Sequence, residues 1–287
     1  MKTPAKKQLR KPQVQTRPGN EKKMRPVPVT DDPTQKGSGK LKGKIALITG
    51  GDSGIGKAVA LLFAKEGASV AIAYLDEHED AADTKAKVEA HGGQCLLIAG
   101  DISREKFCSK VVRNTIKRFK KIDILINNAA VHYECKKPED IETKKMLKTF
   151  GVNIFSMFWI TREALPYMPK GSCIINTSSV TAYRGSPALL DYSATKGAIV
   201  AFTRSLATNL IKRKIRVNGV APGPIWTPLI ASSFDAKHVA AHGSEAPMER
   251  AGQPVEVAPC YLFLASNDAS YISGQFLHPN GGEIING

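Results

Sequence analysis

Short apolar runs alternate with longer stretches of helical periodicity from Lys44 to the end of the chain. The apolar runs predict strands at 44–49, 69–74, 95–99, 122–127, 172–177 and 215–220, with a short last strand near 275–279. The periodic stretches predict helices at about 54–66, 79–91, 104–119, 140–165, 191–213 and 255–266. Because helices separate the strands, the pattern predicts a doubly wound α/β fold with a parallel sheet.

Small and hydrogen-bonding residues follow five of the predicted strands. They are the glycine turn at 50–56, Gly100-Asp101-Ile102, Asn127-Asn128-Ala129-Ala130, Thr177-Ser178-Ser179 and Ala221-Pro222-Gly223. The carboxyl ends of parallel strands lie at one edge of a sheet, and ligands bind there, near the point where the strand order reverses. We therefore expect a ligand site at this edge, although Asp101 also fits a helix N-cap and the paired asparagines also fit a structural role.

The glycine turn lies between a predicted strand and a predicted helix, where backbone N–H groups and the helix dipole favour an anion. Residues 51–57 match the triphosphate-binding loop G-x-x-x-x-G-K, but Ala58 stands where that loop needs Ser or Thr for magnesium. The common dinucleotide pattern G-x-G-x-x-G is not matched either, since Gly50, Gly54 and Gly56 have the spacing G-x-x-x-G-x-G. The turn alone leaves both a phosphate site and a purely structural role open.

The composition fits one large α/β domain, since 42% of the 287 residues are hydrophobic and 23% are charged. No apolar run reaches the roughly 18–20 residues of a membrane span, and residues 1–20 contain no apolar segment typical of a secretion signal. The five cysteines show no C-x-x-C spacing, and His238 and His242 fit an exposed loop, so we expect no metal site. These features predict a cytoplasmic protein without a membrane partner.

Most of the positive charge lies near the N-terminus. Residues 1–44 contain 10 Lys and 3 Arg against three acidic residues, and so contribute +10 of the formal net charge of +15. The segment also has six prolines and few large apolar residues, which predicts an extended or disordered extension. It could be a solvated leader, an arm on a neighbouring subunit or a polyanion-binding appendage; the absence of aromatic residues for base stacking argues against a nucleic-acid partner.

Three side chains with complementary chemistry follow the fifth strand. Tyr192 and Lys196 are four residues apart and so share a helix face, while Ser179 lies at the end of the preceding strand. A free tyrosine titrates near pH 10, so a neighbouring cation is needed to make it a useful base at neutral pH. Lys196 can supply that charge, and Ser179 can hydrogen-bond a substrate oxygen while Tyr192 moves the proton. The alternative is an ordinary amphipathic helix with a chance Tyr/Lys pair.

Taken together, these motifs resemble the short-chain dehydrogenase/reductase family, and most of all its glucose/ribitol-dehydrogenase-like branch. The resemblance rests on TGGDSGIG at 49–56, Asn127-Asn128-Ala129, Val152-Asn153, Ser179, Tyr192-x-x-x-Lys196 and Pro222-Gly223-x-x-x-Thr227, and covers about residues 41–287. It implies an extension over 1–40 and one Rossmann-type domain over 41–287, with helices on both faces of a doubly wound parallel sheet. One departure is Ala130, where the family usually has Gly.

The resemblance also implies the roles of individual residues. Ser179, Tyr192 and Lys196 are expected to be catalytic, with Asn153 holding a water in the proton relay. The cofactor-binding residues it implies are Gly50, Ser53, Gly54, Ile55 and Gly56 at the phosphates, Tyr74 and Asp76 after the second strand, Asp101 and Ile102 beside the adenine, Asn128 and Ala129 near its ribose, Pro222, Gly223, Ile225 and Thr227 near the nicotinamide, and Lys196 on the nicotinamide ribose.

The cofactor is NAD or NADP, and the lack of a clear clamp for a 2′-phosphate favours NAD. Family members that prefer NAD usually have Asp where this chain has Tyr74, and those that prefer NADP usually have Arg or Lys at the positions of Leu75 or Ser53. With neither pattern complete, we expect NAD, with Asp76 as a substitute ribose ligand. Lys57 lies near the same pocket and is the main argument for NADP.

Residues 225–253 have few strand signals and are expected to cover a small-molecule substrate as a lid. Candidate wall residues are His132, Tyr183, Arg184, Pro187, Trp226 and Met248. Mixed polar and aromatic walls suit a sugar, polyol, alcohol, aldehyde or ketone. The resemblance implies a homotetramer assembled through 140–165, 191–213 and the C-terminal segment. The alternative function is a non-catalytic cofactor-binding sensor or scaffold with a polyanion-binding basic tail.

Overall fold

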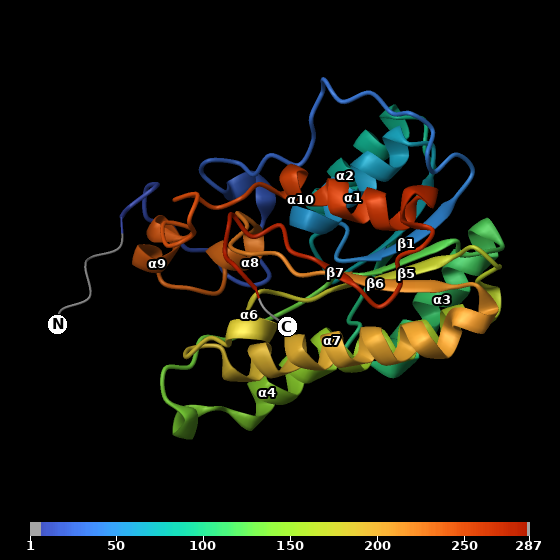
Figure 1. The fold of residues 1–287 in the computed structure, drawn as a ribbon. Coiled ribbons are helices and arrows are strands. Elements are labelled where there is room, and N and C mark those ends of the chain that lie inside the picture. Colours follow the sequence, from blue (N-terminus) through green and yellow to red (C-terminus); the bar gives the residue numbers. More distant parts are fainter. Residues whose placement is uncertain (1–6, 286–287) are drawn as a thin grey trace.

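The computed structural model describes residues 7–285, which form a parallel seven-stranded sheet with the strand order β3-β2-β1-β4-β5-β6-β7 (Figure 1). The strands are β1 (Ile45–Thr49), β2 (Ser69–Tyr74), β3 (Cys95–Ala99), β4 (Ile124–Asn127), β5 (Cys173–Thr177), β6 (Arg216–Val220) and β7 (Phe276–Leu277). All adjacent pairs are parallel. The predicted doubly wound sheet is confirmed, and its strand order reverses between β1 and β4.

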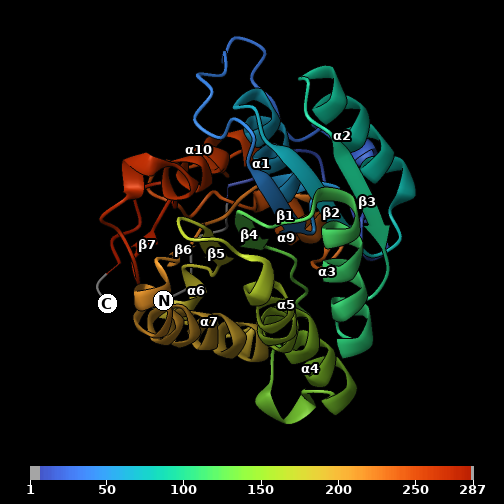
Figure 2. The ribbon, with the colours of Figure 1, turned by 90° about the vertical axis from the view of Figure 1, so that its right-hand side faces the viewer.

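Helices cover both faces of the sheet, as Figure 2 shows. They are α1 (Gly54–Lys65), α2 (His78–Ala90), α3 (Glu105–Phe119), α4 (Thr143–Phe150), α5 (Ser156–Ala164), α6 (Thr181–Arg184), α7 (Leu190–Leu210), α8 (Pro228–Ala231), α9 (Ala236–Ala241) and α10 (Pro254–Ala265). Side chains alternate along each strand, so Ile48 joins the core beneath α1 and α10 while Leu47 joins the core with α3 and α5.

The helix predicted over 140–165 is interrupted. Between α4 and α5 the backbone forms a π-helical turn over Gly151–Phe155, and α4 begins only at Thr143. The turn contains Asn153, whose amide forms hydrogen bonds with Val131. Such a turn inserts one residue into the helical repeat and often lies near a functional site. The apolar periodicity of the sequence continues across it and therefore does not indicate it.

Residues 7–36, which we call the N-terminal strap, pack against the same chain. Met24 is fully buried in a small core with Trp226. The indole Nε1 of Trp226 donates a hydrogen bond to the carbonyl oxygen of Pro26 at 2.8 Å, and the guanidinium of Arg10 lies 4.0 Å from the Trp226 ring centre. The described part of the extension thus follows an extended path, as expected, but it is not a solvated leader. Its partners are distant in sequence, so local composition could not reveal them.

A buried carboxylate connects the strap to the glycine turn. Glu21 is 2% exposed, and its carboxylate accepts hydrogen bonds from the backbone N–H of Gly54 at 2.7 Å and from Lys57 Nζ at 2.5 Å. The N–H of Glu21 donates to Asp80 Oδ2 at 2.8 Å. Burial raises the pKa of Glu21, against the opposite effects of Lys57 and Gly54. The negative charge lies at the N-terminus of α1, where the helix dipole stabilises it.

Replacing Glu21 by Gln is expected to lower the free energy of unfolding by about 2–3 kcal/mol, because buried Lys57 then keeps only Asp83 as a charged partner. Urea unfolding of both proteins measures this. Glu139→Gln, a change of an exposed residue with the same chemistry, is the control and should leave the stability unchanged. Equal stability of Glu21→Gln and the wild type would show that this contact does not hold the strap.

Candidate active site

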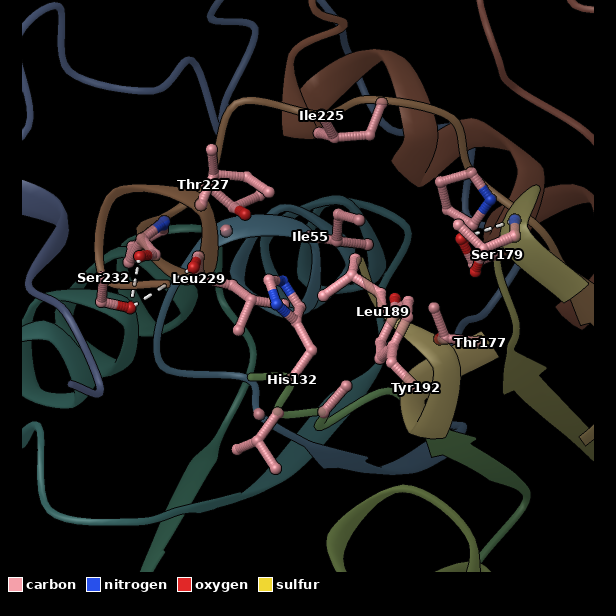
Figure 3. Close-up of a pocket in the computed structure, with 18 of the residues that line it drawn as sticks. Ile55, His132, Thr177, Ser179, Leu189, Tyr192, Ile225, Thr227, Leu229 and Ser232 are labelled. Carbon is pink, nitrogen blue, oxygen red and sulfur yellow. Dashed lines mark hydrogen bonds between the residues drawn. The ribbon is translucent and has the colours of Figure 1, made fainter. Parts of the chain in front are cut away.

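The carboxyl ends of the strands open into a cavity of about 1360 Å³. Residues of the loops after β1 to β6 line it, and the segment from Pro224 to Pro247 covers it (Figure 3). This volume exceeds the roughly 300–1,000 Å³ of a typical small-molecule pocket, so the cavity can hold a large ligand beside a smaller one. The position agrees with the ligand site expected at this edge of the sheet.

Most of the predicted site residues line this cavity. They are Gly50, Ser53, Gly54, Ile55, Tyr74, Asp76, Asp101, Ile102, Asn128, Ala129, Ser179, Tyr192, Lys196, Pro222, Gly223, Ile225 and Thr227. Gly56 and Asn153 are not among the lining residues. Residues far apart in the sequence therefore meet at one surface, and Gly56 and Asn153 are the two predicted residues outside it.

The glycine turn needs glycine for its backbone shape. Gly50 and Gly54 have φ angles of 64° and 52°, in the left-handed region that favours glycine. A Cβ on Gly56 would lie 1.9 Å from the carbonyl oxygen of Gly50, so only glycine allows the turn to close this tightly. The side-chain N–H₂ of Asn128 donates to the carbonyl oxygens of Thr49 and Gly50, both at 3.1 Å. Asn128 therefore also fixes the turn itself.

Asp101 is fully engaged within the chain. Its Oδ2 accepts a hydrogen bond from Lys148 Nζ at 2.6 Å, and its Oδ1 accepts one from the N–H of Ser103 at 2.9 Å. These ionic and capping contacts hold the pKa of Asp101 below its usual value despite partial burial. Asp101 lines the cavity and its side chain closes the turn that precedes α3, but the N-cap residue of α3 is Arg104, so the helix N-cap considered for Asp101 is wrong. Lys148 is a lining residue that the sequence did not indicate.

Ser179, Tyr192 and Lys196 converge as their spacing predicted. Ser179 and Tyr192 both line the cavity, and the Ser179 hydroxyl acts to lower the pKa of Tyr192. Lys196 Nζ donates to the carbonyl oxygen of Thr177 at 2.7 Å and lies 5.4 Å from the centre of the Tyr192 ring. Thr177 is the last residue of β5, and Tyr192 and Lys196 belong to α7, so one strand and one helix set the geometry.

Burial, and not the ammonium group of Lys196, has the largest effect on the pKa values of Tyr192 and Lys196. It raises the pKa of Tyr192 to about 12, with the Ser179 hydrogen bond acting in the opposite direction. It lowers the pKa of Lys196 to about 7. The expected lowering of the Tyr192 pKa by Lys196 is therefore not found. The physical reason is that both groups are removed from water, which disfavours each charged form.

Asn153 lies in the π-helical turn and is fully buried. Its Oδ1 accepts from the N–H of Val131 at 2.8 Å, while its Nδ2 donates to the Val131 carbonyl at 2.9 Å and to Thr195 Oγ1 at 3.1 Å. Both amide N–H groups are therefore used within the protein. The side chain thus fixes the loop after β4 against α7, and the expected part of Asn153 in holding a water stays a prediction.

His132, another candidate wall residue, is almost fully enclosed, at 2% exposure. Its ring centre lies 5.1 Å from that of Tyr192 and 5.0 Å from that of Phe234, as Figure 3 illustrates for His132 and Tyr192. Its Nδ1 is buried without a hydrogen-bond partner. Burial lowers its pKa to about 3, so the imidazole is neutral at pH 7. The loop after β4 thus places an uncharged polar ring beside Tyr192.

The other candidate wall residues divide into two groups. Arg184 and Pro187 line the cavity. Tyr183, Trp226 and Met248 do not: Trp226 is in the core with the strap, Met248 is 63% exposed, and the Tyr183 ring packs against His278. Aromatic character alone did not distinguish packing from lining.

Carboxylates surround the cavity beyond β2. Asp52 and Glu77 line it together with Asp76, and sequence reasoning singled out only Asp76. Burial raises the pKa of Asp52 to about 6, and burial together with Asp76 and Asp52 raises that of Glu77 to about 8. Lys57, by contrast, is 2% exposed, bonded to Glu21 and Asp83, and absent from the lining residues. Lys57 therefore gives no support to a preference for NADP over NAD.

A parallel sheet with a glycine turn after β1 and a Ser/Tyr/Lys group after β5 defines an oxidoreductase that binds a nicotinamide dinucleotide. A family model described as Enoyl-(Acyl carrier protein) reductase matches residues 50–283. The chain is 52% identical to the glucose and ribitol dehydrogenase of Daucus carota over 284 residues, 96% of this chain and 97% of that protein. It belongs to the short-chain dehydrogenase/reductase family, and its cofactor class is NAD or NADP.

Two solved structures are similar to this chain. One is a short chain dehydrogenase from Burkholderia cenocepacia in complex with NADP, 32% identical, with a TM-score of 0.80 and coverage of 85% of this chain and 98% of that chain. The other is 3-ketoacyl-(acyl-carrier-protein) reductase from Brucella melitensis complexed with NADH, 34% identical, with a TM-score of 0.76 and coverage of 84% and 98%. Within residues 7–285 there is no helix with the length and apolar character of a membrane span.

The buried position of Lys196 predicts a pH-dependent stability. A pKa of about 7 in the folded state, below the unfolded value near 10.4, means that the unfolded chain binds more protons above pH 7. The free energy of unfolding of the wild type relative to Lys196→Met should therefore increase by about 2 kcal/mol from pH 7 to pH 9. Urea unfolding at both pH values measures it, with exposed Lys106→Met as the control. A difference that does not change with pH would contradict a buried, neutral Lys196.

Proposed function

We propose that the protein transfers a hydride between a nicotinamide cofactor and a hydroxyl or carbonyl group of a small substrate, with Tyr192 as the acid/base. The substrate class is a sugar, polyol, alcohol, aldehyde or ketone. The observation that carries the proposal is the meeting of Ser179, Tyr192 and Lys196 at one wall of the cavity, with Lys196 Nζ 5.4 Å from the centre of the Tyr192 ring. Membership in a family of oxidoreductases supports the reaction class.

The turn after β1 fits the phosphates of a dinucleotide. Its glycines hold the backbone in a conformation closed to other residues, and its last part is the N-terminus of α1. Gly50, Ser53, Gly54 and Ile55 would face the phosphates from this turn, with Gly56 maintaining its shape. When bound, the nicotinamide supplies or accepts the hydride.

Tyr192 would protonate a carbonyl oxygen during reduction and accept a hydroxyl proton during oxidation. The Ser179 hydroxyl would hydrogen-bond the same oxygen, since it lines the cavity together with Tyr192. Lys196, with its pKa lowered to about 7, is partly protonated at neutral pH, and only its protonated form, 5.4 Å from the Tyr192 ring, would stabilise a phenolate. The lining residues Pro222, Gly223, Ile225 and Thr227 would position the nicotinamide.

The preferred cofactor in this proposal is NAD. Asp52, Asp76 and Glu77 all line the cavity beyond β2, where a carboxylate can accept a hydrogen bond from a ribose hydroxyl. A 2′-phosphate there would add a negative charge next to these groups, and Lys57 is held by Glu21 and Asp83. Both the acidic lining and the loss of Lys57 as a candidate ligand support NAD.

The proposed assembly is a homotetramer built through α4, α5 and α7. Leu147, Phe155 and Phe158 are 58%, 43% and 51% exposed along α4, the π-helical turn and α5. The Phe158 ring lies 4.3 Å from the Phe202 ring of α7, so apolar side chains of both helices meet at one surface. Such a surface is typical of an interface between subunits. A particle mass of four chains by light scattering is the expected result.

The location proposed for the protein is the cytoplasm, because all five cysteines are unpaired, as in proteins of reducing compartments. The alternative of a non-catalytic scaffold with a polyanion-binding tail is not favoured by the family relationship. Two of its basic residues also have partners within the chain, since Arg10 and Arg17 donate to backbone carbonyls of the domain.

Replacing Tyr192 by Phe is expected to lower kcat/KM by about 10²–10⁴-fold, because the group that moves the proton is lost. Absorbance at 340 nm with sugars, polyols, alcohols and aldehydes as substrates measures it, and cofactor affinity should stay within about twofold. Tyr167→Phe, at an exposed tyrosine, is the control. Full activity of Tyr192→Phe would contradict the proposal, and binding of cofactor without turnover of any substrate would favour the scaffold.

Replacing Asp76 by Asn is expected to raise kcat/KM for NADP relative to NAD by about tenfold, because a carboxylate near the additional phosphate becomes neutral. The ratio is measured with both cofactors on one substrate. Glu79→Gln, at an exposed residue of the first turn of α2, is the control and should not change the ratio. A wild-type protein that strongly prefers NADP would show that NAD is the wrong assignment.

A further inference from the structure

The strap contributes a cation to the cavity. Arg17, Pro18 and Gly19 are all lining residues of the cavity. They precede the first strand of the sheet and belong to none of the loops that follow its strands. The Nη2 of Arg17 donates to the carbonyl oxygen of His132 at 2.7 Å, and its guanidinium carbon lies 4.0 Å from the centre of the Tyr133 ring. The loop after β4 therefore holds Arg17 through one backbone carbonyl and one aromatic face.

No carboxylate of the described chain neutralises Arg17. Within residues 7–285 no Asp or Glu oxygen lies within 4.0 Å of its guanidinium, whereas Arg184, the other arginine of the cavity, is paired with Glu283 at 2.5 Å. Glu21, the carboxylate nearest to it in sequence, bonds to Gly54 and Lys57. Glu134, in the loop that holds Arg17, has its Oε1 4.0 Å from His238 Nδ1. The guanidinium has five N–H donors, and the only hydrogen bond from them in this part of the chain is the one to His132.

His132, which contacts both Arg17 and Tyr192, carries a buried polar atom without a partner. His132 is 98% buried, and its Nδ1 has no hydrogen-bond partner. Its backbone carbonyl receives Arg17, and its ring is 5.1 Å from the ring of Tyr192. A buried polar atom without a partner costs free energy unless a ligand or water satisfies it. Arg17 and His132 therefore place N–H donors and a ring nitrogen without a partner on the wall of the cavity that also contains Tyr192.

We propose that Arg17 and His132 form a subsite for an anionic oxygen group, a carboxylate or a phosphate, at the end of the substrate away from its reacting carbon. The inference rests on the proposed function, which places that carbon at Tyr192. A planar guanidinium fits carboxylate and phosphate oxygens with two N–H groups at once, and a neutral imidazole adds one hydrogen bond. Arg17 is then a specificity-determining residue supplied by the strap.

The turnover test compares aldehydes that differ only in their charge. Succinate semialdehyde and glyceraldehyde 3-phosphate carry a carboxylate and a phosphate, and 4-hydroxybutanal and glyceraldehyde are their neutral counterparts. For the wild type we expect kcat/KM to be about 10- to 100-fold higher for one or both anions. Arg17→Gln should bring the ratio of kcat/KM for the anionic and the neutral aldehyde close to one, and Arg17→Lys should restore part of that ratio. Lys11→Gln, which removes one exposed charge from the same strap, is the control.

A binding test separates this inference from the proposed function. Calorimetric titration of 4-hydroxybutyrate and of 1,4-butanediol into the wild type and Arg17→Gln requires no turnover. Tighter binding of 4-hydroxybutyrate that Arg17→Gln loses would support the subsite even if no aldehyde were reduced, in which case only the proposed function fails. Equal binding of the two compounds, together with equal kcat/KM for phosphorylated and neutral glyceraldehyde, would overturn the subsite while turnover still upheld the function.

Discussion

The buried carboxylate of Glu21 is the contact on which the arrangement of the site depends. It accepts from the first N–H of α1 and from Lys57, and the backbone of the same residue bonds to Asp80 of α2. One residue of the strap therefore holds the glycine turn, the first helix and the second helix together. A charge removed from water needs all of these partners at once, so the strap has one position on the domain.

The sheet and the Ser/Tyr/Lys group were predictable because both depend on local pattern. Apolar runs of five or six residues located the strands, and their alternation with helices required a parallel sheet whose carboxyl ends share one edge. The four-residue spacing of Tyr192 and Lys196 placed them on one face of α7, and Ser179 followed β5. These inferences needed no knowledge of contacts distant in sequence.

Features that depend on distant partners could not be predicted in the same way. Lys57 resembles a free cation in the sequence, but Glu21, thirty-six residues earlier, removes it from the pocket. The amide of Asn153 bonds to Val131 and Thr195, and the π-helical turn around it leaves no mark in the apolar pattern. The protonation of Tyr192 and Lys196 depends on how deeply the folded chain buries them, which spacing does not give.

The path of the strap also affects the order in which parts of the chain can fold during synthesis. The strap is synthesised before its partners, since Trp226 lies 200 residues after Pro26 and the carbonyl of Val239 lies 229 residues after Arg10. Contacts at such separations form late, because most of the chain must exist before they can close. The strap is therefore among the last segments to reach its place, and the nascent sheet has to fold with this wall of the cavity still open.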